Sequence, residues 1–375
     1  MGIGLVQVYS ASFVYSTEVL GSGLFFFKRQ LINMLVSLVA LYLAFRIPLK
    51  WFEKWGWTLW LLAAGLLLLC FVPGVGIRAG GATRWLRLPL SLRFEPSELA
   101  KVSFCLFIAS IISLIHRKSP YLQSKKFVVA VLVGLFAPLL ILLKQPDFGS
   151  FALIFAVGGI ALFFHGLKWR WVFAFIASAA VAFYFLIMQV PYRKARLVSF
   201  LDPWSDPEQK GFQVIQSMLS FSSGEFFGVG LGQGQGKLFF LPEAHTDFTL
   251  AVFGEENGFI GFLFLMIIYS LLIHRGLRAS FHASSIYTRT LAICLTSTFA
   301  LNVFVNMGVA LGLLPTKGLT LPFMSYGGSS VVMLGFLFGL LINIESHDGE
   351  KAHTHQRGPT EHIKSTLIKP TIVRI

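Results

Sequence analysis

The feature that most constrains this sequence is a series of long apolar runs with few charges, most of them separated by short polar connections. A helix needs roughly 20 such residues to cross the hydrocarbon core of a bilayer. Nine runs approach or exceed this length, at 31–47, 56–73, 97–116, 126–143, 149–165, 169–190, 248–273, 288–312 and 325–345. The sequence therefore predicts an all-α, polytopic integral membrane protein.

A tenth and shorter run opens the sequence, over about residues 1–16. It has neither the charged leader nor the clean cleavage site of a secretory signal peptide. We interpret it as a truncated first span, which gives about ten transmembrane helices in one domain over residues 1–345. An even number of spans would place both ends of this domain on the same side of the membrane.

The composition excludes other classes of protein. Hydrophobic residues make up 55% of the chain and charged residues 13%, about half the charged share of a soluble domain. The three cysteines (Cys70, Cys105 and Cys294) lie inside apolar runs and have the spacing of neither a disulfide framework nor a zinc site. The net charge of +14 would suggest nucleic acid on a soluble protein, so its location matters.

The positive charge concentrates in one set of short connections, which contain a single acid, Glu53. Their basic residues are Arg46, Lys50, Lys54, Arg117, Lys118, Lys125, Lys126, Lys168, Arg170, Arg275, Arg278 and Arg289. Cytoplasmic connections carry such an excess of Lys and Arg. We therefore expect these connections and both termini to be cytoplasmic. The positive charge then sets the orientation in the membrane, and we expect membrane lipids, not nucleic acid, as its partners.

Two connections on the opposite, extracytoplasmic side are long: residues 74–96, and residues 191–247 between helices 7 and 8. The second is too long for a simple turn between helices, and such loops are often functional. Residues 346–375 are polar and include His347, His353, His355 and His362. We interpret this segment as a flexible cytoplasmic tail, with metal binding by the histidines as the alternative.

Ionisable residues close to the expected spans are candidates for function, because charge is costly inside a membrane. Glu98 follows Pro96 at the start of one span, where a proline and an acid also suit helix initiation. Lys101 does not fit that explanation, since a cation is unfavourable near a helix N-terminus. The two side chains can meet on one helix face. We interpret them as a functional pair, with a purely structural ion pair as the alternative.

A second polar group lies where the connection 191–247 enters the next span. Its residues are Glu243, His245, Thr246 and Asp247. Thr246 or Asp247 could be the N-cap of the helix; the alternative is an acid or base held at the membrane–water boundary. Glu255 and Glu256 follow within the apolar run, where two carboxylates are costly unless they are protonated, paired or facing a cavity.

A third group surrounds Lys317, between Pro315 and Pro322. Lys317 could bind a phosphate, or it could be a lone surface lysine, and the Gly-Gly-Ser-Ser run at 327–330 would permit close helix packing. A glycine-rich run, Gly228 to Lys237, superficially resembles a nucleotide-binding loop. Leu231 stands where that motif needs its first glycine and Leu238 follows the lysine, so we predict no nucleotide site.

These motifs, in this order, resemble those of the SEDS family of cell-wall polymerases, which includes FtsW, RodA and SpoVE, over nearly the whole chain. The motifs are Val-Tyr-Ser-Ala-Ser at 8–12, Arg29-Gln30, Gly-Ala-Thr-Arg-Trp at 81–85, Pro-Ser-Glu-Leu-Ala-Lys at 96–101, Gln-Pro-Asp-Phe-Gly at 145–149, His-Thr-Asp-Phe at 245–248, Gly-Glu-Glu at 254–256 and the block 314–330. Residues 243–247 and 315–320 resemble the division branch more than the elongation branch. One departure is Glu95, which stands where the family usually has Gln.

The resemblance implies a peptidoglycan glycosyltransferase that polymerises lipid II at the outer face of the bacterial cytoplasmic membrane, at the division septum. It also implies a class B penicillin-binding protein, which is a single-span transpeptidase, and other division proteins as partners. The essential loop aspartate of the family corresponds to Asp247, and its Glu/Lys pair corresponds to Glu98 and Lys101. These three are the candidate catalytic residues.

Glycan extension needs a base that takes the proton from the acceptor hydroxyl, and Asp247 is the candidate. The polyprenyl pyrophosphate leaving group needs cations or a divalent metal such as Mg²⁺ or Mn²⁺, for which the sequence indicates no ligands. The candidate substrate-binding residues are Arg84, Arg193, Arg196, Lys317, His245 and Thr246. Two alternatives remain: a lipid II flippase, which would need a polar route through to the cytoplasm, and a non-catalytic division scaffold, which would not need Asp247.

Overall fold

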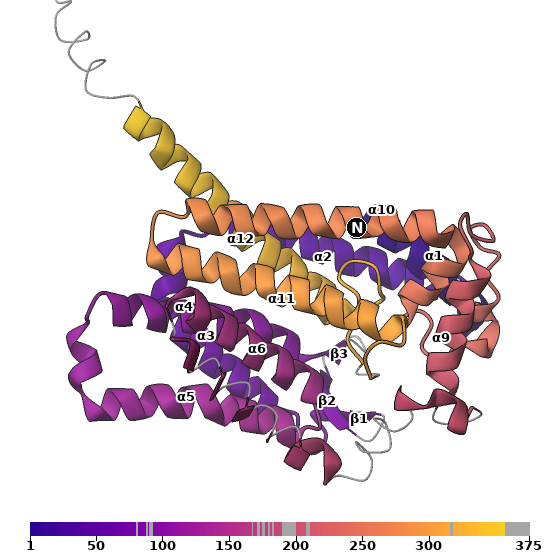
Figure 1. Cartoon of the computed structure of the whole chain (residues 1–375), viewed down its shortest axis with the longest axis horizontal. Helices are drawn as coiled ribbons and strands as arrows, with labels where there is room; N and C mark the ends of the chain where they lie inside the picture. Colours follow the sequence, from indigo (N-terminus) through magenta and orange to yellow (C-terminus); the bar gives the residue numbers. More distant parts are fainter. Residues whose placement is uncertain are drawn as a thin grey trace, which may run out of the picture.

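The structure is a computed structural model that describes residues 1–79, 82–87, 89, 93–166, 168–170, 173–174, 177–178, 181, 184–189, 200–207, 211–315 and 318–356. This part of the chain forms an elongated bundle of helices (Figure 1). The helices are α1 (Gly2–Leu20), α2 (Phe25–Arg46), α3 (Leu49–Leu69), α4 (Pro96–His116), α5 (Lys125–Lys144), α6 (Phe148–Phe164), α9 (Phe212–Ser223), α10 (Thr249–His282), α11 (Ile286–Ala310) and α12 (Gly328–Gln356). Short 3-10 or π-helical turns lie at Pro120–Gln123, Tyr184–Met188, Pro203–Ser205 and Gly236–Phe240.

Among the described residues, six helices are long and apolar enough to cross a membrane: α2, α4, α5, α10, α11 and the Gly328–Ser346 part of α12. Helix α6 is apolar but shorter. The expected span 169–190 falls largely outside the described residues, so the count of about ten stays a prediction. Helix α12 continues beyond residue 345 into the expected tail, of which residues 357–375 lie outside the described part.

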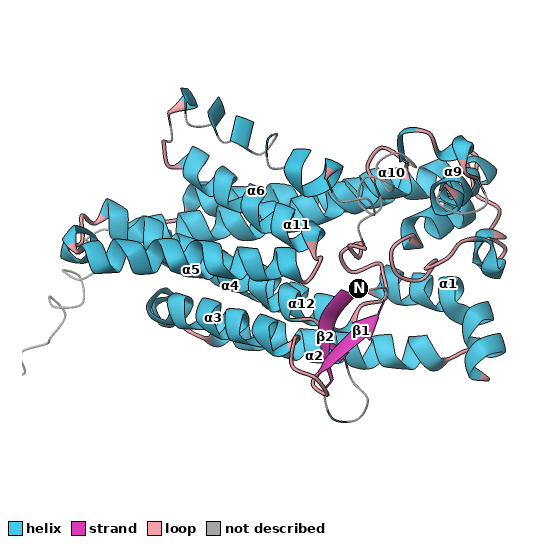
Figure 2. Cartoon of the chain, turned by 90° about the horizontal axis from the view of Figure 1, so that it is seen from below, coloured by secondary structure: helices cyan, strands magenta, loops and turns pink. Residues whose placement is uncertain are grey.

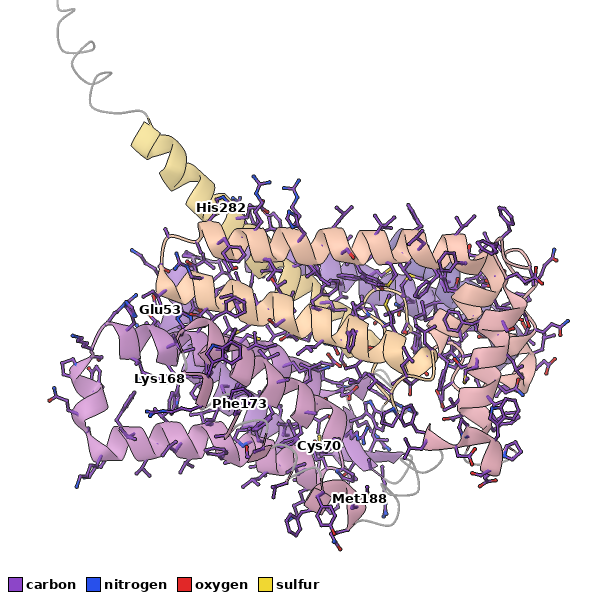
Figure 3. The ribbon with its side chains drawn as sticks, in the orientation of Figure 1. Glu53, Cys70, Lys168, Phe173, Met188 and His282 are labelled. Atoms are coloured by element: carbon purple, nitrogen blue, oxygen red, sulfur yellow. The ribbon has the colours of Figure 1, made fainter. Side chains whose placement is uncertain are left out.

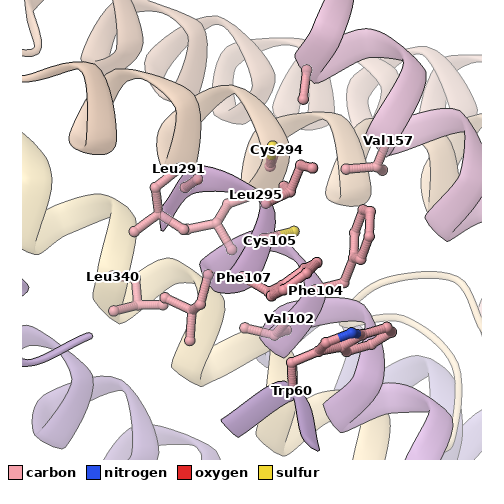
Figure 4. Close-up of a cluster of buried hydrophobic side chains, with 14 of the residues drawn as sticks. Trp60, Val102, Phe104, Cys105, Phe107, Val157, Leu291, Cys294, Leu295 and Leu340 are labelled. Carbon is pink, nitrogen blue, oxygen red and sulfur yellow. The ribbon is translucent and has the colours of Figure 1, made fainter. Parts of the chain in front are cut away.

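Helices α4 and α11 form the centre of the bundle. In the most apolar 18-residue stretch of each helix, 78% of the residues of α4 and 72% of those of α11 are buried. The corresponding shares are 17% in α2 and 22% in α5. Trp60, Phe104, Phe107 and Leu295 pack together in this core (Figure 4). A helix that is apolar all round must be enclosed by its neighbours or by lipid, and here other helices enclose α4.

Helices α2 and α12, at opposite ends of the sequence, pack side by side. The hydroxyl of Ser37 donates to the carbonyl of Val331 (2.7 Å), and the amide of Asn343 donates to the carbonyl of Ala44 (3.0 Å). Gly335 is followed four residues later by another glycine, and a Cβ at either position would overlap the backbone of α2. Such spacing of small residues lets two membrane helices approach closely.

The connection 74–96 contains a small antiparallel sheet, which the expectation of an all-α fold did not include (Figure 2). Its strands are β1 (Gly76–Ala79), β2 (Ala82–Arg87) and β3 (Arg93–Phe94), in the order β1-β2-β3. Strands this short leave too little alternation in the sequence to be recognised. Strand β3 ends two residues before α4 begins, so the sheet lies directly beside the start of α4.

Helix α10 is interrupted at Gly258, which has φ 64° and ψ −167°. The interruption frees two carbonyl groups before the break and two N–H groups after it, and the segment 225–230 bonds all four. The bonds are Val229 N to Glu255 O (3.0 Å), Gly230 N to Glu256 O (3.1 Å), Phe259 N to Glu225 O (2.9 Å) and Ile260 N to Phe226 O (3.2 Å). Backbone exchange with this segment therefore replaces the missing helical hydrogen bonds.

The two ends of the bundle differ in content. The sheet, α9 and the start of α10 gather at one end (Figure 1). Glu53 and His282, which belong to connections expected to be cytoplasmic, lie at the opposite end (Figure 3). There Arg117 forms an ion pair with Glu53 at 2.8 Å.

Candidate functional site

The connection between α11 and α12, of which residues 316 and 317 are not described, and the first turn of α12 link the polar groups at the end of the bundle that holds the sheet. The hydroxyl of Ser329 accepts a hydrogen bond from the backbone N–H of Glu95 (2.9 Å), at the start of α4. The backbone N–H of Tyr326 donates to the carbonyl of His245 (2.9 Å), two residues before Asp247. The end of the connection and the first turn of α12 therefore contact the Asp247 region and the Glu98–Lys101 region, respectively.

The ion pair expected at the start of α4 is present. The ammonium of Lys101 lies 2.7 Å from Oε1 of Glu98, and the side chains are 3% and 14% exposed respectively. Glu98 thus compensates a cation in the first turns of the helix, where the helix dipole alone would oppose it. Because Lys101 is enclosed and paired, it can orient the carboxylate of Glu98, which retains some contact with solvent.

Glu95 precedes this pair and is half-buried. Its Oε1 accepts a hydrogen bond from the hydroxyl of Ser97 (3.1 Å). Removal from water, followed by the negative charges of Glu98 and Asp147, raises the pKa of Glu95 to about 8, although Lys101 acts in the opposite direction. Glu95 is therefore mostly protonated near neutral pH and adds little negative charge beside the pair.

Asp147 and Arg84 complete this side of the site. Asp147 is 3% exposed and caps α6, because its Oδ1 accepts from the backbone N–H of Ser150 (3.2 Å). Its Oδ2 is buried with no hydrogen-bond partner found among the described residues. Arg84, on β2, donates to the carbonyl of Pro146. Asp147 stands at the start of an apolar span, as Glu98 does, and this position is the signal by which the sequence could have indicated it.

Asp247 lies in a turn that leads into α10. The helix begins at Thr249 with Phe248 at the N-cap position, so neither Thr246 nor Asp247 is the N-cap. Asp247 is half-buried, and the side-chain amide of Asn306 donates to its carbonyl (3.1 Å) and also to that of Leu319. A Cβ built on Gly318 would lie 3.4 Å from Oδ2 of Asp247. The start of the α11–α12 connection therefore runs past the Asp247 carboxylate.

His245 and Thr246 support this turn. The imidazole of His245 packs among the rings of Tyr15, Phe26 and Tyr326, at centroid distances of 5.5, 4.6 and 6.1 Å. Burial lowers the pKa of His245, and the charge of Glu243 opposes this effect. Thr246 donates its hydroxyl to Oε2 of Glu243 (2.9 Å). Both predicted substrate-binding side chains thus have partners within the protein.

The cations of the site differ from those that the sequence analysis singled out. Arg193, Arg196 and Lys317 lie outside the described residues. Burial raises the pKa of the Tyr326 phenol, and the charges of Arg29 and Arg93 oppose this effect. Arg29 drew attention in the sequence only as part of a motif. Arg29 was hard to assign from sequence because it lies near the start of an apolar helix, where basic residues are common.

A second buried polar cluster joins α10 to α1. Lys237 lies 2.6 Å from Oε1 of Glu256, with side-chain exposures of 5% and 0%. The hydroxyl of Ser10 donates to the same Oε1 (2.6 Å) and accepts from Lys237 (3.0 Å). Glu256 is thus paired, which is one of the conditions expected for a carboxylate within the apolar run.

The glycine-rich run that precedes Lys237 binds these carboxylates through its backbone. Gln235 N–H donates to Oε1 of Glu255 (2.7 Å), and Gly236 N–H donates to Oε2 of the same residue (3.1 Å). Gly232 N–H donates to Oε1 of Glu256 (3.1 Å). The run does offer amides to anions, but the anions are side chains of α10. The sequence could not reveal this pairing, because about 20 residues and a turn separate the partners.

A metal site built by the protein alone is not present in the described part of the chain, where no group of three or more His, Cys, Asp or Glu side chains is arranged to hold an ion. Mg²⁺ often needs fewer protein ligands, because one or two carboxylates and substrate phosphates can hold it. A divalent cation, Mg²⁺ or Mn²⁺, therefore stays a prediction without assigned ligands.

Comparison with known proteins identifies the family. Residues 1–350 match the family of cell cycle proteins that comprises FtsW, RodA and SpoVE. The chain belongs to this family. It is 41% identical over 343 residues to a probable peptidoglycan glycosyltransferase FtsW of Geobacter metallireducens, covering 92% of this chain and 91% of the relative. A second relative of that name, from Thioalkalivibrio sulfidiphilus, is 42% identical over 348 residues, covering 92% and 86% respectively.

Solved structures share the fold. A chain from a peptidoglycan synthase complex that coordinates polymerization and crosslinking matches with a TM-score of 0.70 and 27% identity, over 92% of this chain and 97% of that chain. The rod-shape-determining protein RodA of Thermus thermophilus matches with a TM-score of 0.63 and 24% identity, over 91% of this chain and 94% of that chain. With its apolar spans, this member of the family is a multi-pass membrane protein.

Proposed function

We propose that this chain is a peptidoglycan glycosyltransferase that polymerises lipid II for septal wall synthesis. The observation that carries the proposal is that two residues three positions apart, Tyr326 in the α11–α12 connection and Ser329 in the first turn of α12, contact the turn that contains Asp247 and the start of α4, respectively. Family membership and the names of the FtsW relatives support the same activity. A site at one end of membrane-crossing helices also suits a substrate whose lipid stays in the bilayer.

Asp247 acts as the general base in this proposal. Its carboxylate takes the proton from the acceptor sugar hydroxyl, while that oxygen forms a bond to the anomeric carbon of the donor. The bond from this carbon to the pyrophosphate breaks on the opposite side, with inversion, and the polyprenyl pyrophosphate leaves with the electron pair. A base positioned in this way contributes typically about 10²- to 10⁴-fold in rate.

Positive charge balances the leaving pyrophosphate. Arg84, Arg193, Arg196 and Lys317 are the proposed direct partners, while Lys101 orients Glu98 from its buried position. A divalent cation would add charge stabilisation if the reaction needs one. Polymerisation measured with Mg²⁺, with Mn²⁺ and after chelation tests this requirement.

The proposed setting is the bacterial cytoplasmic membrane at the septum, with both termini and the tail in the cytoplasm. A class B penicillin-binding protein and other division proteins are the proposed partners. The match to a chain from a peptidoglycan synthase complex supports a synthase partner, and the excess of Lys and Arg in one set of connections supports the orientation.

The decisive experiment reconstitutes the purified full chain in proteoliposomes and supplies labelled lipid II only from the outer side, with and without the cognate transpeptidase. We expect glycan strands from the chain with its partner. Movement of lipid II across the bilayer without strands would identify a flippase. Neither strands nor movement of lipid II from the purified chain, together with normal division in cells whose Asp247→Asn variant still binds the partner, would identify a scaffold.

A further inference from the structure

The connection 191–247 includes a segment in which most exposed side chains are apolar, with Glu225 as its one charged residue. In residues 224–231, Phe226, Phe227 and Leu231 are 65%, 83% and 62% exposed. Earlier in the same connection, exposed Leu201 and Trp204 lie among Asp202 and other polar residues. Two adjacent exposed phenylalanines next to glycines therefore need a non-aqueous neighbour.

The depth of this segment follows from α10. After Gly258, the uncharged stretch of α10 runs from Phe259 to Ile273, which is 15 residues or about 22 Å of helix. A hydrocarbon core about 30 Å thick is longer than this stretch. If the charged end that begins at His274 lies at one boundary, the break at Gly258 lies inside the hydrocarbon near the other boundary. Residues 225–230 are bonded to that break.

The backbone of the segment is suited to such a position. A non-helical backbone is tolerated in hydrocarbon only when protein groups satisfy its hydrogen bonds. Val229 and Gly230 donate to α10, and the carbonyls of Glu225 and Phe226 accept from it. Gly228 donates to the carbonyl of Gly224 (2.8 Å). The backbone thus faces α10 while the phenyl rings face outward.

The outward rings also continue a surface that faces lipid. Exposed apolar side chains run along one side of α10, at Phe259, Ile260, Leu263, Phe264, Ile267 and Leu271. The ring of Phe226 contacts that of Phe259, with centroids 5.8 Å apart in an edge-to-face arrangement. Phe226 and Phe227 therefore extend this side of α10 beyond the break.

We propose that residues 224–231 form a re-entrant element that contacts the acyl chains of membrane lipids through Phe226 and Phe227. This segment of the long connection is then part of the membrane domain. The element anchors the adjoining glycine-rich run, whose backbone binds the carboxylates of Glu255 and Glu256. This role is independent of the reaction at the site, so the proposal does not rest on the proposed function.

Fluorescence quenching in lipid nanodiscs tests this placement in the full chain. A bimane label on Phe227→Cys is compared with labels on Leu263→Cys, in the exposed surface of α10, and on Leu201→Cys, at an exposed position beside Asp202. Cys70, Cys105 and Cys294 are buried, and the unsubstituted chain gives their background labelling. Leu231→Cys repeats the measurement if the substitution at Phe227 does not fold.

We expect lipids brominated on their acyl chains to quench the label at position 227 as they quench the label at 263, and aqueous iodide to quench only the label at 201. Quenching at 227 by iodide, as at 201, would overturn the proposal. Protection at 227 from both quenchers would also overturn it, in favour of a protein neighbour such as a partner helix or a second copy.

Discussion

At the scale of single residues, the site contains two kinds of charged group. Buried ion pairs also stabilise the fold, whereas the half-buried carboxylate of Asp247 is better suited to chemistry. Lys101 is bonded to Glu98 and Lys237 to Glu256, at 2.7 and 2.6 Å. Removing one member of a buried pair costs about 3–5 kcal/mol, so variants of these residues will change stability as well as activity. Asp247 is half-buried and its backbone is held independently by Asn306.

Asp247→Asn should therefore separate chemistry from folding. We expect the melting temperature to stay close to that of the unsubstituted chain and lipid II polymerisation to fall at least about 100-fold, because the amide cannot accept the proton. Asp202→Asn, at an exposed position in the same connection, is the matched control and should retain activity. A normal polymerisation rate in the purified Asp247 variant would remove this residue as the base.

Glu95 makes stability depend on pH. Its pKa is about 8 in the folded protein, against an ordinary value of 4.5. Between these two values the unfolded chain loses this proton and the folded chain keeps it, so the free energy of unfolding falls as pH rises through this window and levels off above it. We expect Glu95→Gln to reduce the loss of melting temperature between about pH 5 and about pH 9.

Glu18→Gln, at an exposed position, should leave that pH dependence unchanged. Equal pH dependence in the Glu95 and Glu18 variants would contradict the role of Glu95.

At the scale of elements, apolar length was a good guide to helices and a poor guide to their irregularities. The apolar run 126–143 corresponds closely to helix α5, Lys125–Lys144. Helix α3 begins earlier than expected, at Leu49, because its first turns combine charged residues with tryptophans that suit a membrane boundary. The break in α10 escaped prediction because the apolar composition continues through Gly258, and what stabilises the break is a segment about 30 residues earlier.

The break makes Gly258 the most sensitive glycine of α10. Its φ and ψ fall in a region that is essentially restricted to glycine, where other residues pay about 1–3 kcal/mol, and a Cβ would overlap the backbone of Gly228. We expect Gly258→Ala to lower the melting temperature clearly. Gly65→Ala, in α3 with open space around it, should be neutral or stabilising by up to about 1 kcal/mol. Equal effects of the two substitutions would show that the break is not required.

At the scale of the whole molecule, the polar motifs lie at one end of the bundle and the basic connections at the other. The sequence identified the motifs and predicted the Glu98–Lys101 pairing, because i, i+3 neighbours on a helix meet. It could not show that Ser329 would bond to Glu95 or Tyr326 to His245, because such long-range contacts depend on how the helices pack.

The two ends should be accessible from opposite sides of the membrane. Tyr121, between α4 and α5, and Leu313, after α11, are both 68% exposed. The distribution of Lys and Arg predicts the cytoplasm for the first and the exterior for the second. In intact spheroplasts, a membrane-impermeant maleimide should label Leu313→Cys and should label Tyr121→Cys only after permeabilisation. The reverse pattern would invert the proposed orientation.

The pairing of α2 with α12 also has a consequence for biosynthesis. About 300 residues separate the two helices, and at about 5–20 residues per second the ribosome needs about 15–60 s to make them. During that interval Ser37 and the side of α2 that packs against α12 lack the helix that they contact in the finished protein. The bundle therefore closes only after α12 has been synthesised, so a nascent chain arrested before Gly335 leaves this face of α2 without its protein neighbour.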